Sequence, residues 1–156
     1  MPRLMSFAKT VEPFRDGTKL ETRRDGWQFL EPGDLIEGVD RSPRSGQGYE
    51  RLGLAIVETV RRELLTRITE DGVTREGFPG KSWEWFVRMF CGGEIDFERE
   101  VTVITFAECG DCERRAAWRC EKCGLCLCAE HAPAASTCRS CEGWEFAAIQ
   151  EGEADD

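Results

Sequence analysis

Eight of the nine cysteines and the only histidine of this 156-residue chain fall within one short stretch, between positions 109 and 141. Thiolate and imidazole groups are preferred ligands of Zn²⁺, and two intervening residues allow one tight turn to place both ligands on the same metal. Taken in order, the stretch contains close pairs with Cys126 left over: Cys109 and Cys112, Cys120 and Cys123, Cys128 and His131, Cys138 and Cys141. These pairs suit two tetrahedral zinc ions.

Disulfide bonds and iron–sulfur ligation are the alternatives for so many cysteines. A disulfide framework requires an oxidising compartment, but the first residues lack the apolar segment of a secretory signal. No apolar run reaches membrane-spanning length, so we expect a cytoplasmic protein with no membrane partner. Repeated CxxC pairs then favour metal ligation. The pairs can share ions in sequence order or in a cross-brace, in which the first joins the third and the second joins the fourth.

The spacing of these ligands, with Ala117, Gly124 and Leu127 between them, resembles a B-box-type zinc finger, a cross-brace relative of the RING fold. This resemblance implies one ion on Cys109, Cys112, Cys128 and His131, and a second on Cys120, Cys123, Cys138 and Cys141. The last pair departs from B-boxes, which usually end in histidines. Sites closed by four protein ligands are structural, because they leave no position for substrate. The family implies a protein partner for the finger, and we interpret Cys126 as a buried or free thiol.

Any other site must be held by the region upstream of these ligands, whose pattern predicts several short strands and few helices. Gly17 is the predicted C-terminal cap of a helical turn, and Ser82 is the predicted N-cap of a helix that reaches Cys91 with one apolar face. Alternation of apolar residues is clearest in the last two predicted strands. The expected strands are 4–8, 19–24, 35–39, 51–61 and 100–106, the helical turn is 11–16, and loops are expected at 41–48 and 70–78.

The fold class that follows is α+β. We predict a small mixed β-barrel over residues 1–106, a small zinc-stapled finger over 107–141, and an acidic C-terminal tail over 142–156. Few apolar side chains are available in the finger, so metal binding must supply much of its folding free energy. We therefore expect Cys120→Ser to unfold the finger and to leave the thermal transition of the barrel largely intact.

The segment Gly17-Thr18-Lys19-Leu20-Glu21-Thr22-Arg23-Arg24, followed by Pro32-Gly33-Asp34 before an apolar strand, resembles the ASCH domain, a PUA-like β-barrel. The resemblance spans nearly all of residues 3–106 and fits a bacterial or phage protein. The PUA-like superfamily contains RNA-binding domains and readers of modified bases. It therefore implies RNA or a modified nucleotide as the ligand, bound through Lys19, Arg23 and Arg24.

A second function is implied by small ASCH proteins that resemble amidohydrolases of acylated cytidines and use a lysine, a threonine and a glutamate. Lys19 and Thr22 match the first two by position, and Glu76 is our choice for the third, with Glu70 as the alternative. If His131 binds zinc, no histidine remains as a general base. A lysine that loses solvation in a cleft can instead become a base that activates Thr22 or water. On an exposed strand the same lysine would be a solvated charge.

Charge limits the kind of nucleic-acid partner. The net charge of −9 argues against tight non-specific binding, which depends mainly on phosphate neutralisation. Trp27 and Phe29, close after the paired arginines, suit either stacking on an unpaired base or core packing. We therefore predict a local basic cleft for a nucleotide or a short RNA segment. The remaining hypothesis is an adaptor that docks a protein partner through its zinc finger.

Overall fold

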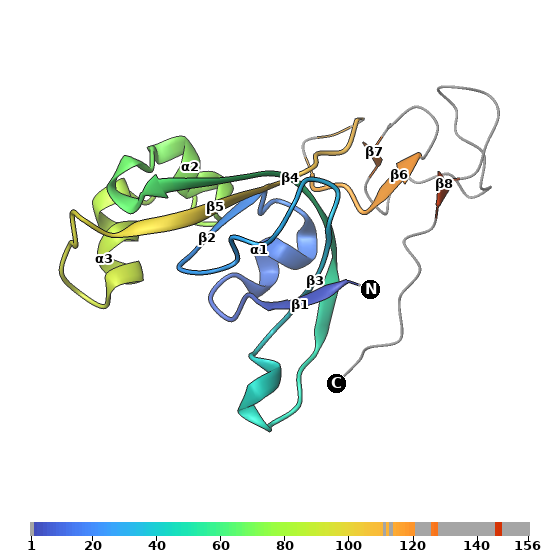
Figure 1. Ribbon diagram of the computed structural model, residues 1–156, viewed down its shortest axis with the longest axis horizontal. Helices are drawn as coiled ribbons and strands as arrows, with labels where there is room; N and C mark the ends of the chain where they lie inside the picture. The colour runs from blue at the N-terminus through green and yellow to red at the C-terminus, as the bar shows by residue number, and fades with distance from the viewer. Residues whose placement is uncertain (1, 111, 113, 121–125, 128–145, 148–156) are drawn as a thin grey trace.

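A computed structural model describes residues 2–110, 112, 114–120, 126–127 and 146–147 (Figure 1). Its helices are α1 (Val11–Asp16), α2 (Glu70–Arg75) and α3 (Trp83–Cys91), with 3-10 turns η1 (Pro43–Ser45) and η2 (Leu65–Arg67). Its strands are β1 (Arg3–Ser6), β2 (Glu21–Arg24), β3 (Leu35–Val39), β4 (Arg51–Leu64), β5 (Glu100–Phe106), β6 (Trp118–Cys120), β7 (Cys126–Leu127) and β8 (Phe146–Ala147). None of the helices in the described part of the chain has the length and apolar character needed to cross a membrane.

The main sheet has five strands in the order β1-β3-β4-β5-β2. Strand β4 is 14 residues long and curls, so that its first part pairs with β3 and its second part with β5 (Figure 1). A register shift between Val57 and Thr59 separates the two parts, as expected of a bulge that bends a strand. The edge strands β1 and β2 are bridged by a side chain, because Arg24 Nη2 donates to the Ser6 carbonyl at 2.6 Å. The predicted α+β class is confirmed as a curled half-barrel.

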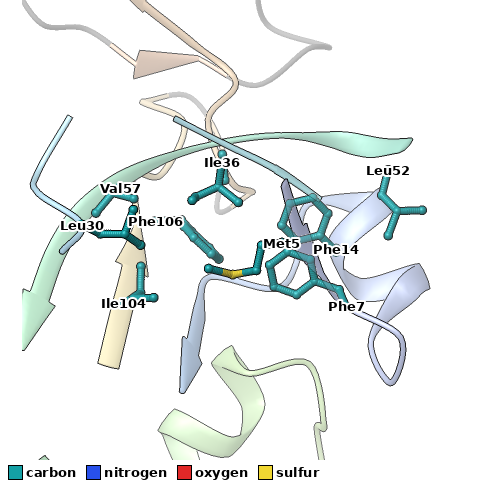
Figure 2. Packing of buried hydrophobic residues seen from close by; sticks show 10 residues of the cluster. Met5, Phe7, Phe14, Leu30, Ile36, Leu52, Val57, Ile104 and Phe106 are labelled. Carbon is teal, nitrogen blue, oxygen red and sulfur yellow. The ribbon is translucent and has the colours of Figure 1, made fainter. Parts of the chain in front are cut away.

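The first hydrophobic core lies between this sheet and α1 (Figure 2). Phe7 and Phe14 stack at its centre, with ring centroids 4.2 Å apart and an interplanar angle of 18°. Gly38 of β3 permits this arrangement, because a Cβ atom there would lie 2.2 Å from the Phe14 ring. The other buried members are Met5, Leu30, Ile36, Leu52, Ala55, Val57, Ile104 and Phe106.

A second core forms where α2 and α3 cover the far part of β4 and β5. Helix α3 begins as predicted, since the Ser82 side chain accepts from Trp85 N–H at 3.1 Å. The loop predicted over 70–78 is wrong in part, because the structure places α2 there. Thr69 caps α2 by accepting from Gly72 N–H at 3.0 Å. Packing around α2 is tight at Gly72, since a Cβ there would lie 3.0 Å from Ile68 Cγ1 and 3.2 Å from Glu21 Oε1.

After β5 the chain forms a hairpin that is fastened to the first core. Glu108 and Arg115 pair antiparallel across it. The Arg115 guanidinium donates from Nη1 to the Phe14 carbonyl at 2.6 Å and from Nε to the Leu54 carbonyl at 2.9 Å. Its backbone N–H donates to the Gly17 carbonyl at 2.7 Å. Beyond the hairpin, β6 pairs antiparallel with β7 and β8.

Candidate functional site

A cavity of about 380 Å³ lies where the two cores meet, beside the bridged edges of β1 and β2. Its apolar lining includes Phe7 from the first core and Phe86 from the second. Its polar lining comes mainly from β2, the residue Lys19 before it, and the end of α2. An apolar hollow with a few convergent polar groups is the usual form of a small-molecule site.

Lys19 is placed by the way α1 ends. Gly17 adopts a left-handed conformation with φ of 85° and caps the helix. The chain then turns so that Lys19 N–H donates to the Pro13 carbonyl at 2.9 Å. The Lys19 side chain is only 3% exposed, and its Nζ lies 3.0 Å from Glu76 Oε1. It also donates to the backbone carbonyl of Glu76, so one residue supplies both acceptors.

Glu76 follows directly after α2 and is itself buried. While Oε1 contacts Lys19, Oε2 accepts from the backbone N–H of Arg23 at 3.1 Å. The carboxylate therefore joins the end of α2 to strand β2. Burial lowers the pKa of Lys19, and the charge and hydrogen bond of Glu76 oppose this shift only in part. The arrangement favours loss of the proton from Lys19 at a lower pH than for an exposed lysine.

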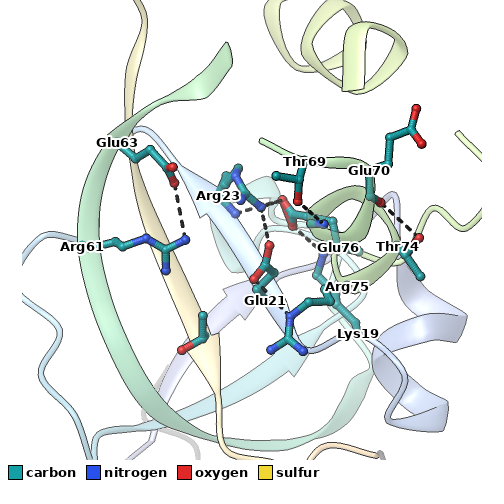
Figure 3. Close-up of polar contacts among 12 residues, drawn as sticks. Lys19, Glu21, Arg23, Arg61, Glu63, Thr69, Glu70, Thr74, Arg75 and Glu76 are labelled. Carbon is teal, nitrogen blue, oxygen red and sulfur yellow. Dashed lines mark hydrogen bonds and ion pairs between the residues drawn. The ribbon is translucent and has the colours of Figure 1, made fainter. Parts of the chain in front are cut away.

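A chain of buried charges continues from this pair toward α2 (Figure 3). Arg23 Nη1 lies 2.7 Å from Glu21 Oε1 and 3.8 Å from Glu76 Oε2. Glu21 Oε2 in turn lies 3.3 Å from Arg75 Nε. Each carboxylate in the chain thus contacts two cationic side chains. Such a network holds Glu76 in one orientation, since turning it away would leave buried charges unpaired.

Thr22 and Arg24 share one face of β2, as alternate residues of a strand do. Arg24 Nε donates to Thr22 Oγ1 at 3.2 Å, and its guanidinium carbon lies 4.9 Å from the centre of the Phe7 ring. Burial lowers the pKa of Arg24, against the raising effect of the Glu76 charge. Both side chains line the cavity.

The three residues predicted for amide hydrolysis line the same cavity: Lys19, Thr22 and Glu76. Arg24 joins them there. Arg23 also borders the cavity, but its guanidinium is paired with the buried Glu21. Glu70, the alternative to Glu76, is exposed on the first turn of α2. The structure thus assembles the predicted residues, and their roles remain predictions.

Sequence reasoning missed Glu21 and the wall that α3 contributes to the cavity. Alternation with Arg23 along β2 was the available signal for Glu21. The spacing of Phe86 and Phe90 predicts an apolar helix face, but nothing in it indicates that this face borders a cavity. That juxtaposition depends on how α3 packs against the sheet, which is a tertiary property.

The two aromatic residues with alternative interpretations have different surroundings. Trp27 packs partly against the first core, with a φ of 70° that bulky side chains rarely adopt. Phe29 is 56% exposed, and the Arg3 guanidinium lies 4.5 Å from its ring centre. Core packing therefore describes Trp27, while Phe29 remains on the surface.

The first cysteine pair lies in a turn of the hairpin that follows β5. Cys109 and Cys112 lie in the turn closed by Glu108 and Arg115, and Cys109 N–H donates to the Arg114 carbonyl at 2.8 Å. A turn of this kind suits two thiolates on one metal. Cys120, the first residue of the next pair, is the last residue of β6, which pairs antiparallel with β7. The predicted ligands Cys123, Cys128, His131, Cys138 and Cys141 lie outside the described residues, as does the side chain of Cys120.

No protein-family model and no curated protein matches this chain. Among solved structures it is similar to ASCH from Zymomonas mobilis, with a TM-score of 0.49 and 12% identity, over 81% of this chain and 73% of that one. A mutant of that protein has a TM-score of 0.46 at 12% identity over 81% and 75% of the two chains. The ASCH domain from Lactobacillus crispatus JV V101 has a TM-score of 0.45 at 15% identity over 67% and 78%.

Proposed function

We propose that the cavity binds one nucleotide, either free or as part of a short RNA segment. The observation that carries the proposal is the convergence of Lys19, Thr22, Arg24 and Glu76 on a cavity whose lining also includes several aromatic rings, those of Phe7, Phe78, Phe86 and Phe90. Unpaired bases are recognised by aromatic stacking together with hydrogen bonds to their edges. The hydroxyl, ammonium and carboxylate groups here offer both donors and acceptors for such an edge.

The size of the cavity favours a single base over a longer strand. Its volume of about 380 Å³ lies toward the small end of ligand pockets. The net charge of −9 makes a long polyanion unfavourable outside a local basic region. A nucleotide inserted into the cavity satisfies both constraints.

Calorimetric titration with cytidine 5′-monophosphate, its N4-acetyl derivative and a short single-stranded RNA tests the proposal. Thr22→Val keeps the shape of the side chain and removes its hydroxyl, so we expect about tenfold weaker binding. Thr74→Val, on the exposed side of α2, is the matched control and should bind as the wild type does. Failure of the wild type to bind any of these ligands, or equal affinities for Thr22→Val and wild type, would contradict the proposal.

A second candidate, hydrolysis of an N-acylated cytidine-type nucleoside, is favoured by the buried Lys19 with its lowered pKa. Neutral Lys19 would accept a proton from water or from the Thr22 hydroxyl, and the resulting oxygen nucleophile would add to the amide carbonyl carbon. The C–N bond would then break, with the proton transferred to the leaving amine. An acyl group on Thr22 would be released by water as the carboxylic acid. Glu76 would orient the Lys19 amine.

Chromatographic measurement of cytidine released from N4-acetylcytidine tests this second candidate. Lys19→Arg should abolish turnover, because a guanidinium does not lose its proton. Glu76→Gln should slow turnover by removing the group that orients Lys19. Lys81→Arg is the control, since Lys81 is exposed near Trp85 rather than in the cavity. Absence of wild-type turnover, or full turnover by Lys19→Arg, would reject it.

For the cysteine-rich segment the proposal includes two structural zinc ions on the predicted cross-brace ligands. The position of Cys109 and Cys112 in the turn closed by Glu108 and Arg115 supports it. Elemental analysis, with thiols counted before and after chelation, should give two zinc ions per chain. One ion or none would reject the cross-brace. A protein partner for this segment stays a prediction from the B-box resemblance.

A further inference from the structure

Arg24 is held in place but not fully used by the protein. Its Nε and Nη2 donate to Thr22 Oγ1 and to the Ser6 carbonyl, and its plane is near the Phe7 ring. Within the part of the chain that the structure describes, Nη1 has no hydrogen-bond partner. Every buried side-chain nitrogen or oxygen in the same part does have a partner, so an unpartnered Nη1 is not a buried atom. Nη1 is therefore accessible, on a side chain that lines the cavity.

The carboxylates near Arg24 are already engaged elsewhere. Glu76 contacts Lys19 and Arg23, and Asp25 lies 2.6 Å from Arg99 Nη2. Among the described residues, Arg24 takes part in no ion pair.

Lys9, which also lines the cavity, likewise lacks a carboxylate partner among the described residues. Its Nζ contacts the Met89 sulfur at 3.4 Å, and it has no ion pair within the described residues. The cavity of an acidic protein therefore contains two cationic side chains without counterions. An arginine that is desolvated and unpaired is costly, and an oxyanion supplied by a ligand would offset that cost.

We infer that Arg24, assisted by Lys9, forms a subsite for a phosphate group of the bound nucleotide. The inference rests on the proposed function and adds which part of the ligand is charged and which residue binds it. The guanidinium is oriented by three protein groups and presents its free edge to the cavity, so a phosphate oxygen can accept without rearrangement of the site. The phosphate is either the terminal group of a free mononucleotide or a phosphodiester of RNA.

Titrations with cytidine, cytidine 5′-monophosphate and the dinucleotide CpA separate these sources. Wild type should bind at least one phosphorylated ligand about tenfold or more tightly than cytidine, as a charge-assisted hydrogen bond allows. Preference for the monophosphate identifies a terminal phosphate, and preference for CpA identifies a phosphodiester. In Arg24→Met the preference should disappear, so that the phosphorylated ligands bind no more tightly than cytidine does. Arg24→Lys should retain part of it, and Arg61→Met, an exposed arginine paired with Glu63, should retain all of it.

The outcomes distinguish the inference from the function on which it rests. Equal wild-type affinities for cytidine and both phosphorylated ligands would overturn the phosphate subsite and leave nucleoside binding intact. A phosphate preference that survives in Arg24→Met would also overturn it. Failure of all three ligands to bind wild type would overturn the proposed function and the subsite together. Thermal unfolding of each variant confirms that it is folded before its affinities are compared.

Discussion

Arg24 and Arg115 lie at the two ends of one continuous set of contacts, and their guanidinium groups have different hydrogen-bond acceptors. Arg24 is near the Phe7 ring, Phe7 stacks on Phe14, and the Arg115 guanidinium carbon lies 3.7 Å from the centre of the Phe14 ring. Burial lowers the pKa of both, that of Arg115 to about 10. Neither forms an ion pair within the described residues.

The difference lies in the acceptors. Arg115 donates to the main-chain carbonyls of Phe14 and Leu54, so its charge serves to join the hairpin to the core. Arg24 makes one bond to a main-chain carbonyl, that of Ser6, and one to the Thr22 hydroxyl, and it borders a cavity. A buried arginine whose donors meet backbone is part of the scaffold, whereas one with an accessible edge in a cavity is available to a ligand.

Arg115→Met should have the largest effect on stability. It leaves two buried carbonyls without their charged donor, and each such bond contributes about 1.5–3 kcal/mol. We expect the free energy of unfolding to fall by about 3–5 kcal/mol, measured by urea denaturation. Ligand affinity should not change once the protein is folded. Weaker nucleotide binding by folded Arg115→Met would show that the ring contacts couple the two arginines. It would contradict the assignment of Arg115 to the scaffold alone.

Substitutions in the buried pair Lys19 and Glu76 should cause the next largest loss of stability. Lys19→Met leaves the Glu76 carboxylate with only the Arg23 contacts, and breaking a buried ion pair costs about 3 kcal/mol or more. Glu76→Met should lower the free energy of unfolding by at least as much. The double variant should lose less than the sum of the two, by about 0.5–3 kcal/mol. Strict additivity in urea denaturation would mean that the two side chains do not interact in solution.

Gly38→Ala should produce an intermediate loss of about 1–3 kcal/mol, because it overpacks the core. The new methyl group would lie 2.2 Å from the Phe14 ring, which stands between the two arginines. Gly26→Ala, where the added Cβ would meet nothing within 4 Å, is the control. A loss in Gly38→Ala no greater than in this control would show that the Phe14 ring moves freely.

The sequence predicts some of this arrangement and not the rest, for physical reasons. The pattern from Gly17 to Arg24 is local, so it located β2 and the side chains that border the cavity. The predicted strands match the observed ones within a few residues, although β4 runs on to Leu64. The loop expected over 70–78 was wrong where α2 forms. In this helix Gly72 makes a close approach to Glu21, which only the folded sheet provides.

The different roles of the two arginines also could not be predicted from the sequence. Arg24 was singled out by the spacing of a strand motif. Arg115 lies between cysteines and reads as one charge among many in the predicted finger. Its acceptors are the carbonyls of Phe14 in α1 and Leu54 in β4, which lie 101 and 61 residues earlier in the chain.

The ionisation of Lys19 should make a smaller, pH-dependent contribution to the free energy of unfolding. In the unfolded chain its pKa returns to the ordinary 10.5, and in the folded protein it is lower. Between these two values the unfolded state binds more protons, so this group increases stability as pH rises through that window. The stability difference between wild type and Lys19→Met should therefore grow in favour of wild type toward pH 10.5. In Glu76→Gln, nitrogen NMR of the Lys19 amine should show a still lower pKa, because the opposing charge is gone.

Cys120→Ser should have the smallest effect on the half-barrel. Arg115 and Ala116 precede Cys120 and are held by their own hydrogen bonds, Arg115 N–H to the Gly17 carbonyl and Ala116 N–H to the Ala107 carbonyl at 2.8 Å. The anchor of the hairpin therefore does not depend on the segment beyond it. The finger should unfold and lose zinc, while the free energy of the main unfolding transition changes by no more than about 0.5 kcal/mol. Loss of that transition together with the zinc would mean that the cysteine-rich segment and the half-barrel fold as one unit, and that Arg115 alone does not fasten the hairpin.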